Sequence, residues 1–319
     1  MVVAYGTLGT DVTEHKTVLL KEAVDALTID ADGFYIDGTF GRGGHCAELL
    51  SRLSECGAVT AIDKDPEAIA AGMSRFADDD RLTLVHGTFA DLGEIVEQAG
   101  KHGSVSGVLL DLGVSSPQLD QAQRGFSFLR DGPLDMRMDT SKGQSAADWL
   151  ASADEKEIAQ VIKEYGEERF ARRMAAAIVR ERVETPILRT VQLAEILAAA
   201  HPAWERGKHP ATKAFQAIRI FINRELADLE TLLEQIIDTL AVGGRLVIIS
   251  FHSLEDRRVK RFIRDQERGI KLPKNIPIRD VDRGVRLVKV GKPIKPQDSE
   301  VDSNIRARSA VMRVAERVA

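Results

Sequence analysis

The sequence is poor in cysteine, in aromatic residues and in long apolar stretches, and the first and last of these shortages each exclude a class of protein. Its 319 residues include two cysteines, which are too few for a disulfide framework and lack metal-ligand spacing. No apolar run exceeds seven residues, whereas a membrane-spanning helix needs about 20. The first residues lack the basic and then apolar layout of a signal peptide. We therefore expect a cytoplasmic protein, and its 44% hydrophobic residues are enough for a sizeable core.

Charge is distributed unevenly along the chain. The formal net charge is −5, yet the segment 255–295 holds 14 Lys and Arg against 6 Asp and Glu. A basic segment on an otherwise acidic protein favours one surface that faces phosphates, as in nucleic-acid-binding proteins. A solvated helix and loop rich in Lys and Arg explains the same composition equally well.

The first third of the chain alternates strand-like and helix-like segments. The pattern predicts strands at 34–37, 58–63, 82–85 and 107–111, with helices between them at about 45–55, from 66 onward and at 91–100. Strands that alternate with helices of this length are typical of βαβ units and a parallel sheet. The predicted fold class is therefore α/β.

The middle of the chain carries only helix signals. Between about 126 and 210 no segment is strand-like, and capping patterns occur at 152–155 and at Thr190. Apolar residues three or four apart then predict one long helix over 212–240, ended by Gly243 and Gly244. Strands at 245–250, 286–290 and 307–314 are expected to complete the sheet. These boundaries predict a core of residues 1–125 and 211–319, with an all-helical insertion at 126–210.

A glycine-rich turn follows the first predicted strand and reads DGTFGRGGH from Asp37. Glycines let the backbone turn sharply and approach a ligand closely. Asp63 ends the second predicted strand, where a carboxylate can accept hydrogen bonds from ribose hydroxyls. Cys46 stands where a pyrophosphate-binding fingerprint needs a small residue, and the Walker pattern is absent. The spacing of Asp37, Gly41 and Gly43 instead resembles the first motif of class I S-adenosylmethionine (SAM) methyltransferases, and this resemblance implies SAM rather than NAD or a nucleoside triphosphate.

Seven segments carry a more specific resemblance. They read HKTVLLKEAVDAL from His15, DGTFGRGGH from Asp37, DLGVSSPQLD from Asp111, GFSF and GPLDMRMD within 125–139, FQAIRIFINREL from Phe215, ISFHSLEDR from Ile249 and NIRARSAVMRVAE from Asn304. Together they resemble one bacterial family of class I SAM-dependent methyltransferases, which methylates N4 of a cytosine in the decoding region of 16S ribosomal RNA. The resemblance runs from residue 15 to residue 316. It implies an enzyme with a Rossmann-like sheet, an inserted helical domain, and 16S rRNA in the small ribosomal subunit as its partner.

The resemblance also implies a set of cofactor-binding residues. These are Gly43, Gly44, His45, Asp63, Phe89, Asp111 and Gln118. In this set Asp63 binds the ribose, and Phe89 lies beside the adenine, where an apolar ring can pack against a purine face. Taken by itself, Phe89 is more simply explained as a core aromatic residue.

Methyl transfer to an amine requires alignment of the nitrogen with the sulfonium carbon, and the nitrogen must lose a proton. DNA amino-methyltransferases commonly carry Asp, Asn or Ser followed by Pro-Pro-aromatic after the fourth strand. Here that place reads DLGVSSP from Asp111, without the double proline or the aromatic residue. Asp111, Ser115 and Ser116 are the catalytic candidates, although a loop or cap hydrogen bond explains either serine as well.

Two segments are candidates for contact with RNA. Arg124, Phe126 and Arg137 belong to a run that mixes cations with aromatic rings, as single-stranded RNA sites often do, although the rings could instead anchor the insertion. Five more candidates are His252, three positions before the basic segment, and Arg257, Arg258, Lys260 and Arg261 within it.

Other readings of these residues are weaker. The segment 251–256 contains the residue types of a hydrolase triad, but immediate neighbours cannot easily converge on one point. The seven histidines lack metal-site spacing, so no metal is expected. A methyltransferase acting on another amine remains an alternative, as does a non-catalytic RNA-binding assembly factor. The intact glycine motif and Asp63 disfavour the second of these.

Overall fold

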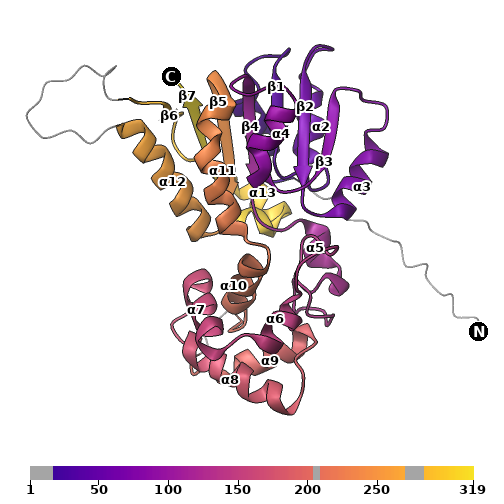
Figure 1. The fold of residues 1–319 in the computed structure, drawn as a ribbon, viewed down its shortest axis with the longest axis vertical. Coiled ribbons are helices and arrows are strands. Elements are labelled where there is room, and N and C mark those ends of the chain that lie inside the picture. The colour runs from indigo at the N-terminus through magenta and orange to yellow at the C-terminus, as the bar shows by residue number, and fades with distance from the viewer. Residues whose placement is uncertain (1–16, 204–208, 270–283) are drawn as a thin grey trace, which may run out of the picture.

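One sheet organises the larger part of the protein (Figure 1). The structure is a computed structural model that describes residues 17–203, 209–269 and 284–319. The strand order is β3-β2-β1-β4-β5-β7-β6. The strands are β1 (Phe34–Asp37), β2 (Ala58–Asp63), β3 (Leu82–His86), β4 (Val105–Asp111), β5 (Leu240–Ser250), β6 (Leu287–Lys289) and β7 (Val311–Arg317). The first five run parallel and β7 is antiparallel to both neighbours, which confirms the predicted α/β fold and its C-terminal strand pair.

Helices cover both faces of the sheet because successive residues of a strand point to opposite sides. Leu109 packs in an apolar cluster with α1 and α2, whereas Leu110 packs in a second cluster with α4, α11 and α12. The helices of this part are α1 (Leu20–Leu27), α2 (Gly44–Leu50), α3 (Pro66–Arg75), α4 (Leu92–Gln98), α11 (Glu225–Thr239) and α12 (Ser253–Arg268). Burial on both faces explains why β4 and β5 are rich in apolar residues.

A second group of helices lies below the sheet in Figure 1 and has an apolar core of its own. Its members are α6 (Ala146–Ser152), α7 (Glu155–Gly166), α8 (Ala171–Glu184), α9 (Thr190–Ala200) and α10 (Thr212–Ile222). Phe215 and Ile218 of α10 belong to this core. The boundary predicted at residue 211 is therefore wrong, because α10 packs with the insertion rather than with the sheet.

Short helices lie at the carboxyl ends of the parallel strands and bring further side chains to this edge of the sheet. They are η1 (Phe89–Asp91) after β3, α5 (Ser116–Asp120) and η2 (Ala122–Arg124) after β4, and α13 (Asp298–Ser303) and η4 (Ile305–Ser309) before β7.

The predicted long helix over 212–240 is two helices. It breaks at Asn223 and Arg224, where Arg224 adopts a left-handed φ of 55°. The amide of Asn223 pairs with the backbone of another segment, donating to the Met136 carbonyl at 2.7 Å and accepting from Met138 N at 2.7 Å. These bonds fix a corner that an apolar stripe cannot reveal. The strand that follows begins at Leu240, so Gly243 and Gly244 lie within β5 and do not end the helix.

Smaller boundary predictions also differ. Asp154, rather than Ser152, caps α7 by accepting a hydrogen bond from Glu157 N at 2.7 Å. Thr190 is the first residue of α9, and its hydroxyl instead accepts from Gly132 N at 3.1 Å. Part of the predicted basic segment, 270–283, lies outside the described residues.

Candidate active site

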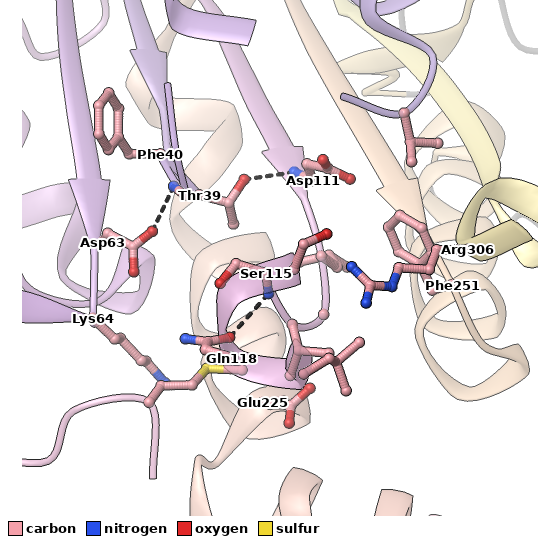
Figure 2. A pocket seen from close by; sticks show the side chains of 18 of the residues that line it. Thr39, Phe40, Asp63, Lys64, Asp111, Ser115, Gln118, Glu225, Phe251 and Arg306 are labelled. Carbon is pink, nitrogen blue, oxygen red and sulfur yellow. Dashed lines mark hydrogen bonds between the residues drawn. The ribbon is translucent and has the colours of Figure 1, made fainter. Parts of the chain in front are cut away.

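A cavity of about 570 Å³ opens at the carboxyl ends of the parallel strands. Figure 2 shows Asp63, Asp111, Ser115 and Glu225 around it. In an open parallel sheet this edge is where ligands bind, because the loops that follow the strands meet there. Six of the seven predicted cofactor residues line the cavity, and so do all three catalytic candidates. Gly43, the seventh, does not line the cavity but lies in the same turn as Gly44.

The turn after β1 requires glycine at two positions, Gly43 and Gly44. Gly43 has a φ of 72°, and a Cβ there would lie 2.8 Å from the rings of Phe40 and Phe76. A Cβ on Gly44 would lie 1.8 Å from Thr17 Oγ1. Both conditions favour glycine, since other residues are strained at positive φ and would collide with these neighbours.

Asp63 holds this turn in place. Its Oδ2 accepts from Gly41 N at 2.7 Å, and its Oδ1 accepts from Asp65 N at 2.8 Å. Burial raises the pKa of Asp63 to about 6, against the lowering effect of these two hydrogen bonds. Each carboxylate oxygen has a second lone pair, so the group can still accept from a hydroxyl in the cavity.

Two further carboxyls lie at the ends of β1 and β4. Burial raises the pKa of Asp37 to about 7, and it raises the pKa of Asp111 well above its usual range, with added repulsion from Asp37. Among the described residues neither Asp37 Oδ2 nor Asp111 Oδ1 has a hydrogen-bond partner, although both atoms are buried. Asp111 Oδ2 lies 3.7 Å from His45 Nδ1. Buried acceptors without donors fit a ligand that brings cationic or N–H groups.

Phe89 and Gln118 line the part of the cavity that is bounded by the ends of β1 to β4, called the cofactor half below. Phe89 packs partly against the apolar cluster of one sheet face and also lines the cavity. Gln118 is buried, accepts from Ser115 N at 2.9 Å and donates to Asp65 Oδ2 at 2.9 Å. Gln118 thus fixes the start of α5, where Ser115 is the N-cap.

The predicted RNA contacts differ in their exposure and in their partners. Arg124 and Phe126 are buried, and Arg124 donates to Asp65 at 2.7 Å, so the prediction that they contact RNA is wrong. Ion pairs also engage Arg137 with Asp135, Arg257 with Glu167 and Arg258 with Glu230. Lys260 and Arg261 are exposed on α12, whereas His252 is the one RNA candidate that lines the cavity.

The other half of the cavity contains a charged group that the sequence did not single out. Arg219 Nε and Nη2 each lie 2.8 Å from an oxygen of Glu225. Glu255 Oε2 accepts from Phe251 N at 2.8 Å and from His252 N at 3.2 Å. All of these residues lie in segments 215–226 and 249–257 of the resemblance, but the six-residue separation of Arg219 and Glu225 follows no local helix rule.

This group also includes side chains of the types that bind metal ions. Among the described residues, Glu225, His252 and Glu255 have potential ligand atoms within 4.8 Å of one another. Arg219 pairs with the carboxylate of Glu225 through two hydrogen bonds, so a cation of the protein itself already holds one of the three groups.

The sheet, the glycine cradle and the buried acceptors together define a Rossmann-like methyltransferase whose cavity fits SAM. The profile of the MraW methylase family matches residues 12–318. The chain belongs to this family, and SAM is its cofactor.

Curated relatives agree with this assignment. A ribosomal RNA small subunit methyltransferase H from Chromohalobacter salexigens is 60% identical over 95% of this chain and 92% of its own length. Proteins of the same name from Alteromonas mediterranea and Thioalkalivibrio sulfidiphilus are 57% and 58% identical, each over 96% of this chain and 98% of their own length. Within the described ranges, no helix is long and apolar enough to cross a membrane.

Proposed function

We propose that this protein methylates N4 of a cytosine in the decoding region of 16S rRNA, acting on the small ribosomal subunit in the cytoplasm. The observation that carries the proposal is the continuous cavity, in which a cofactor cradle meets a second, polar half at Asp111 and Ser115. The names of the curated relatives support ribosomal RNA as the substrate.

The cofactor half suits the two ends of SAM. Bound there, SAM supplies an electrophilic methyl group on a sulfonium. The glycine turn brings Gly44 and His45 to the cavity wall, where the amino-acid end is assigned, and the free acceptor of Asp111 suits its ammonium group. Asp63 is assigned to the ribose and Phe89 to the adenine. His45 and Gln118 complete the set, Gln118 by fixing the loop from which Ser115 borders the acceptor half.

The acceptor half suits an extruded base. An enzyme that modifies a base must take it out of its stack and read its polar edge in a pocket. Asp111, Ser115 and Ser116 lie in the wall shared by the two halves and are assigned to the amine protons of the target. Lys260 and Arg261 are assigned to phosphates outside the cavity, since exposed cations on one helix can follow an RNA backbone.

Mass-spectrometric mapping of small-subunit rRNA tests the proposal. Subunits that lack the modification are incubated with SAM and the protein, and one decoding-region cytosine is expected to gain 14 mass units, about one methyl in place of hydrogen. Methyl transfer to another amine, with the rRNA unchanged, would replace the substrate. SAM binding without transfer to any subunit component would favour an assembly factor.

A further inference from the structure

Arg306 connects two walls of the cavity. It belongs to η4, just before β7, and it lines the cavity. Its Nη2 donates to Asp120 Oδ1 at 2.6 Å, across 186 positions of the sequence. Asp120 is the last residue of α5, whose N-cap is Ser115, and Figure 2 shows Arg306 extending toward Ser115. The guanidinium therefore lies beside the loop that carries the catalytic candidates.

Four Lys and Arg side chains line the cavity in the described part of the chain: Arg42, Lys64, Arg219 and Arg306. Lys64 and Arg219 pair with carboxylates whose side chains are 9% exposed or less. Removing such a buried partner is strongly destabilising, because it leaves a charge without compensation. Arg42 lies in the glycine turn and belongs to the cofactor half. Arg306 differs from these, since its partner Asp120 is 61% exposed.

The ion pair between Arg306 and Asp120 is easily exchanged for another. The Arg306 side chain is itself 37% exposed, and water screens such a pair, so the pair contributes little to stability. Asp120 accepts one hydrogen bond from the guanidinium, and among the described residues Nε and Nη1 of Arg306 have no acceptor. A phosphate group can accept two parallel N–H groups of one guanidinium. A phosphate is therefore a better partner for Arg306 than Asp120 is.

We propose that Arg306 binds a backbone phosphate next to the target cytidine, and that Asp120 holds the guanidinium at the cavity until the RNA takes its place. The inference rests on the proposed function. A base that enters the acceptor half leaves its phosphates where the cavity meets solvent, since only the base is read inside the pocket. An exposed ion pair beside Ser115 lies at such a position. Phosphate contacts fix the position of a nucleic acid, so Arg306 binds the substrate and takes no part in the chemical step.

The variant Arg306→Gln tests the phosphate contact. Binding of unmodified small subunits is measured by filter binding across salt concentrations. We expect the affinity to be about tenfold lower and the log–log salt slope to be smaller by about 0.7, the value of one phosphate contact. The single-turnover rate at saturating subunits and SAM should stay within about twofold of wild type, because a lost binding contact raises the half-saturating concentration and not the rate. Calorimetric titration should show an unchanged SAM affinity.

Asp120→Asn should act in the opposite direction. This change frees the guanidinium before the RNA arrives, so the affinity for subunits should rise about two- to fivefold, the scale of an exposed ion pair. The gain should shrink when the same change is made in Arg306→Gln, because no guanidinium then remains to be freed. An ion pair with a purely structural role would make both single variants bind subunits more weakly, which would overturn the inference.

The chain offers a matched control in Arg189, whose Nη2 also lies 2.6 Å from an exposed carboxylate, that of Asp131. Arg189 is the N-cap of α9 in the helical insertion and does not line the cavity. Arg189→Gln should therefore keep both the affinity for subunits and the salt slope.

The outcomes distinguish the inference from the function beneath it. A wild-type protein that methylates no subunit overturns the proposed function. A wild-type protein that methylates, together with a folded Arg306→Gln variant of unchanged affinity and salt slope, overturns only the inference. Weaker SAM binding in Arg306→Gln with an unchanged salt slope would assign the guanidinium to the carboxylate of SAM, and would also overturn it.

Discussion

The two halves of the cavity are built by different means. The cofactor half comes from four strand ends within the first 118 residues, and its shape depends on backbone turns and glycines. The acceptor half comes from three segments after residue 210, and its shape depends on ion pairs between side chains. Added atoms should therefore disturb the cofactor half, and lost charges should disturb the acceptor half. We expect substitutions in the cofactor half to weaken SAM binding and substitutions in the acceptor half to lower methylation.

The largest effect is expected at the buried ion pair between Arg124 and Asp65. Arg124→Met leaves Asp65 as a buried carboxylate without its ion-pair partner, and we expect the free energy of unfolding to fall by about 3–5 kcal/mol. Urea unfolding measures this. Arg130→Met, at an exposed neighbour, is the control. An Arg124→Met protein as stable as wild type but weaker in RNA binding would restore the original interpretation of Arg124 as an RNA contact.

Gly43→Ala should break the cofactor half alone. The added Cβ meets two aromatic rings at 2.8 Å in a left-handed conformation that costs about 1–2 kcal/mol by itself. Calorimetric titration should show SAM affinity at least about tenfold weaker. Gly100→Ala pays the same backbone cost at a φ of 63°, with nothing within 4 Å, and should bind SAM normally. Equal SAM affinity in both variants would argue against a tight cradle.

Arg219→Lys should give the reverse pattern. Lysine keeps the charge but loses the two parallel hydrogen bonds to Glu225, so the acceptor half loses its order. Methylation should fall about tenfold, roughly 1.4 kcal/mol, while SAM affinity stays within about twofold. Arg180→Lys, on an exposed helix face, should change neither quantity. Loss of SAM binding in Arg219→Lys would show that the halves are not independent.

The raised pKa of Asp37, about 7, makes stability depend on pH. A carboxyl whose pKa rises on folding stabilises the fold fully below pH 4, and this contribution is lost as the pH rises through about 7. Asp37→Asn imitates the protonated group, so it should stabilise the protein by about 1–3 kcal/mol at pH 8 and little near pH 4. Unfolding curves at both pH values check this, with the exposed Asp78→Asn as control. A constant difference across pH would contradict it.

The smallest effect is expected outside both halves, on α12. Replacing Lys260 and Arg261 together by Gln should reduce the log–log salt slope of RNA binding by about 1.4, or roughly 0.7 for each lost phosphate contact. Filter binding across salt concentrations measures this slope. Lys101→Gln, before the amino end of β4, is the control. An unchanged slope would make α12 a solvated surface and place the RNA path elsewhere.

The sequence identified residues that meet at one end of the cavity because the signals that mark them are local. A strand, a glycine turn and an acid at the end of the next strand occupy residues 34–63, and their spacing is set by the chain itself. The long apolar stripe over 212–240 misled for the opposite reason. Both α10 and α11 continue the stripe, yet Asn223 breaks the helix by bonding to Met136 and Met138, about 85 residues away.

The sequence by itself determined the alternation of strands and helices, the family resemblance and the residues of the cofactor turn, because periodicity and turn chemistry act over a few neighbouring residues. Only the tertiary structure decided that Arg124 is buried against Asp65, 59 positions away, and that His252 and Glu255 face the cavity that begins at Asp63. Whether a charged side chain meets solvent, a ligand or another charge depends on the packing of distant elements. No local pattern carries that information.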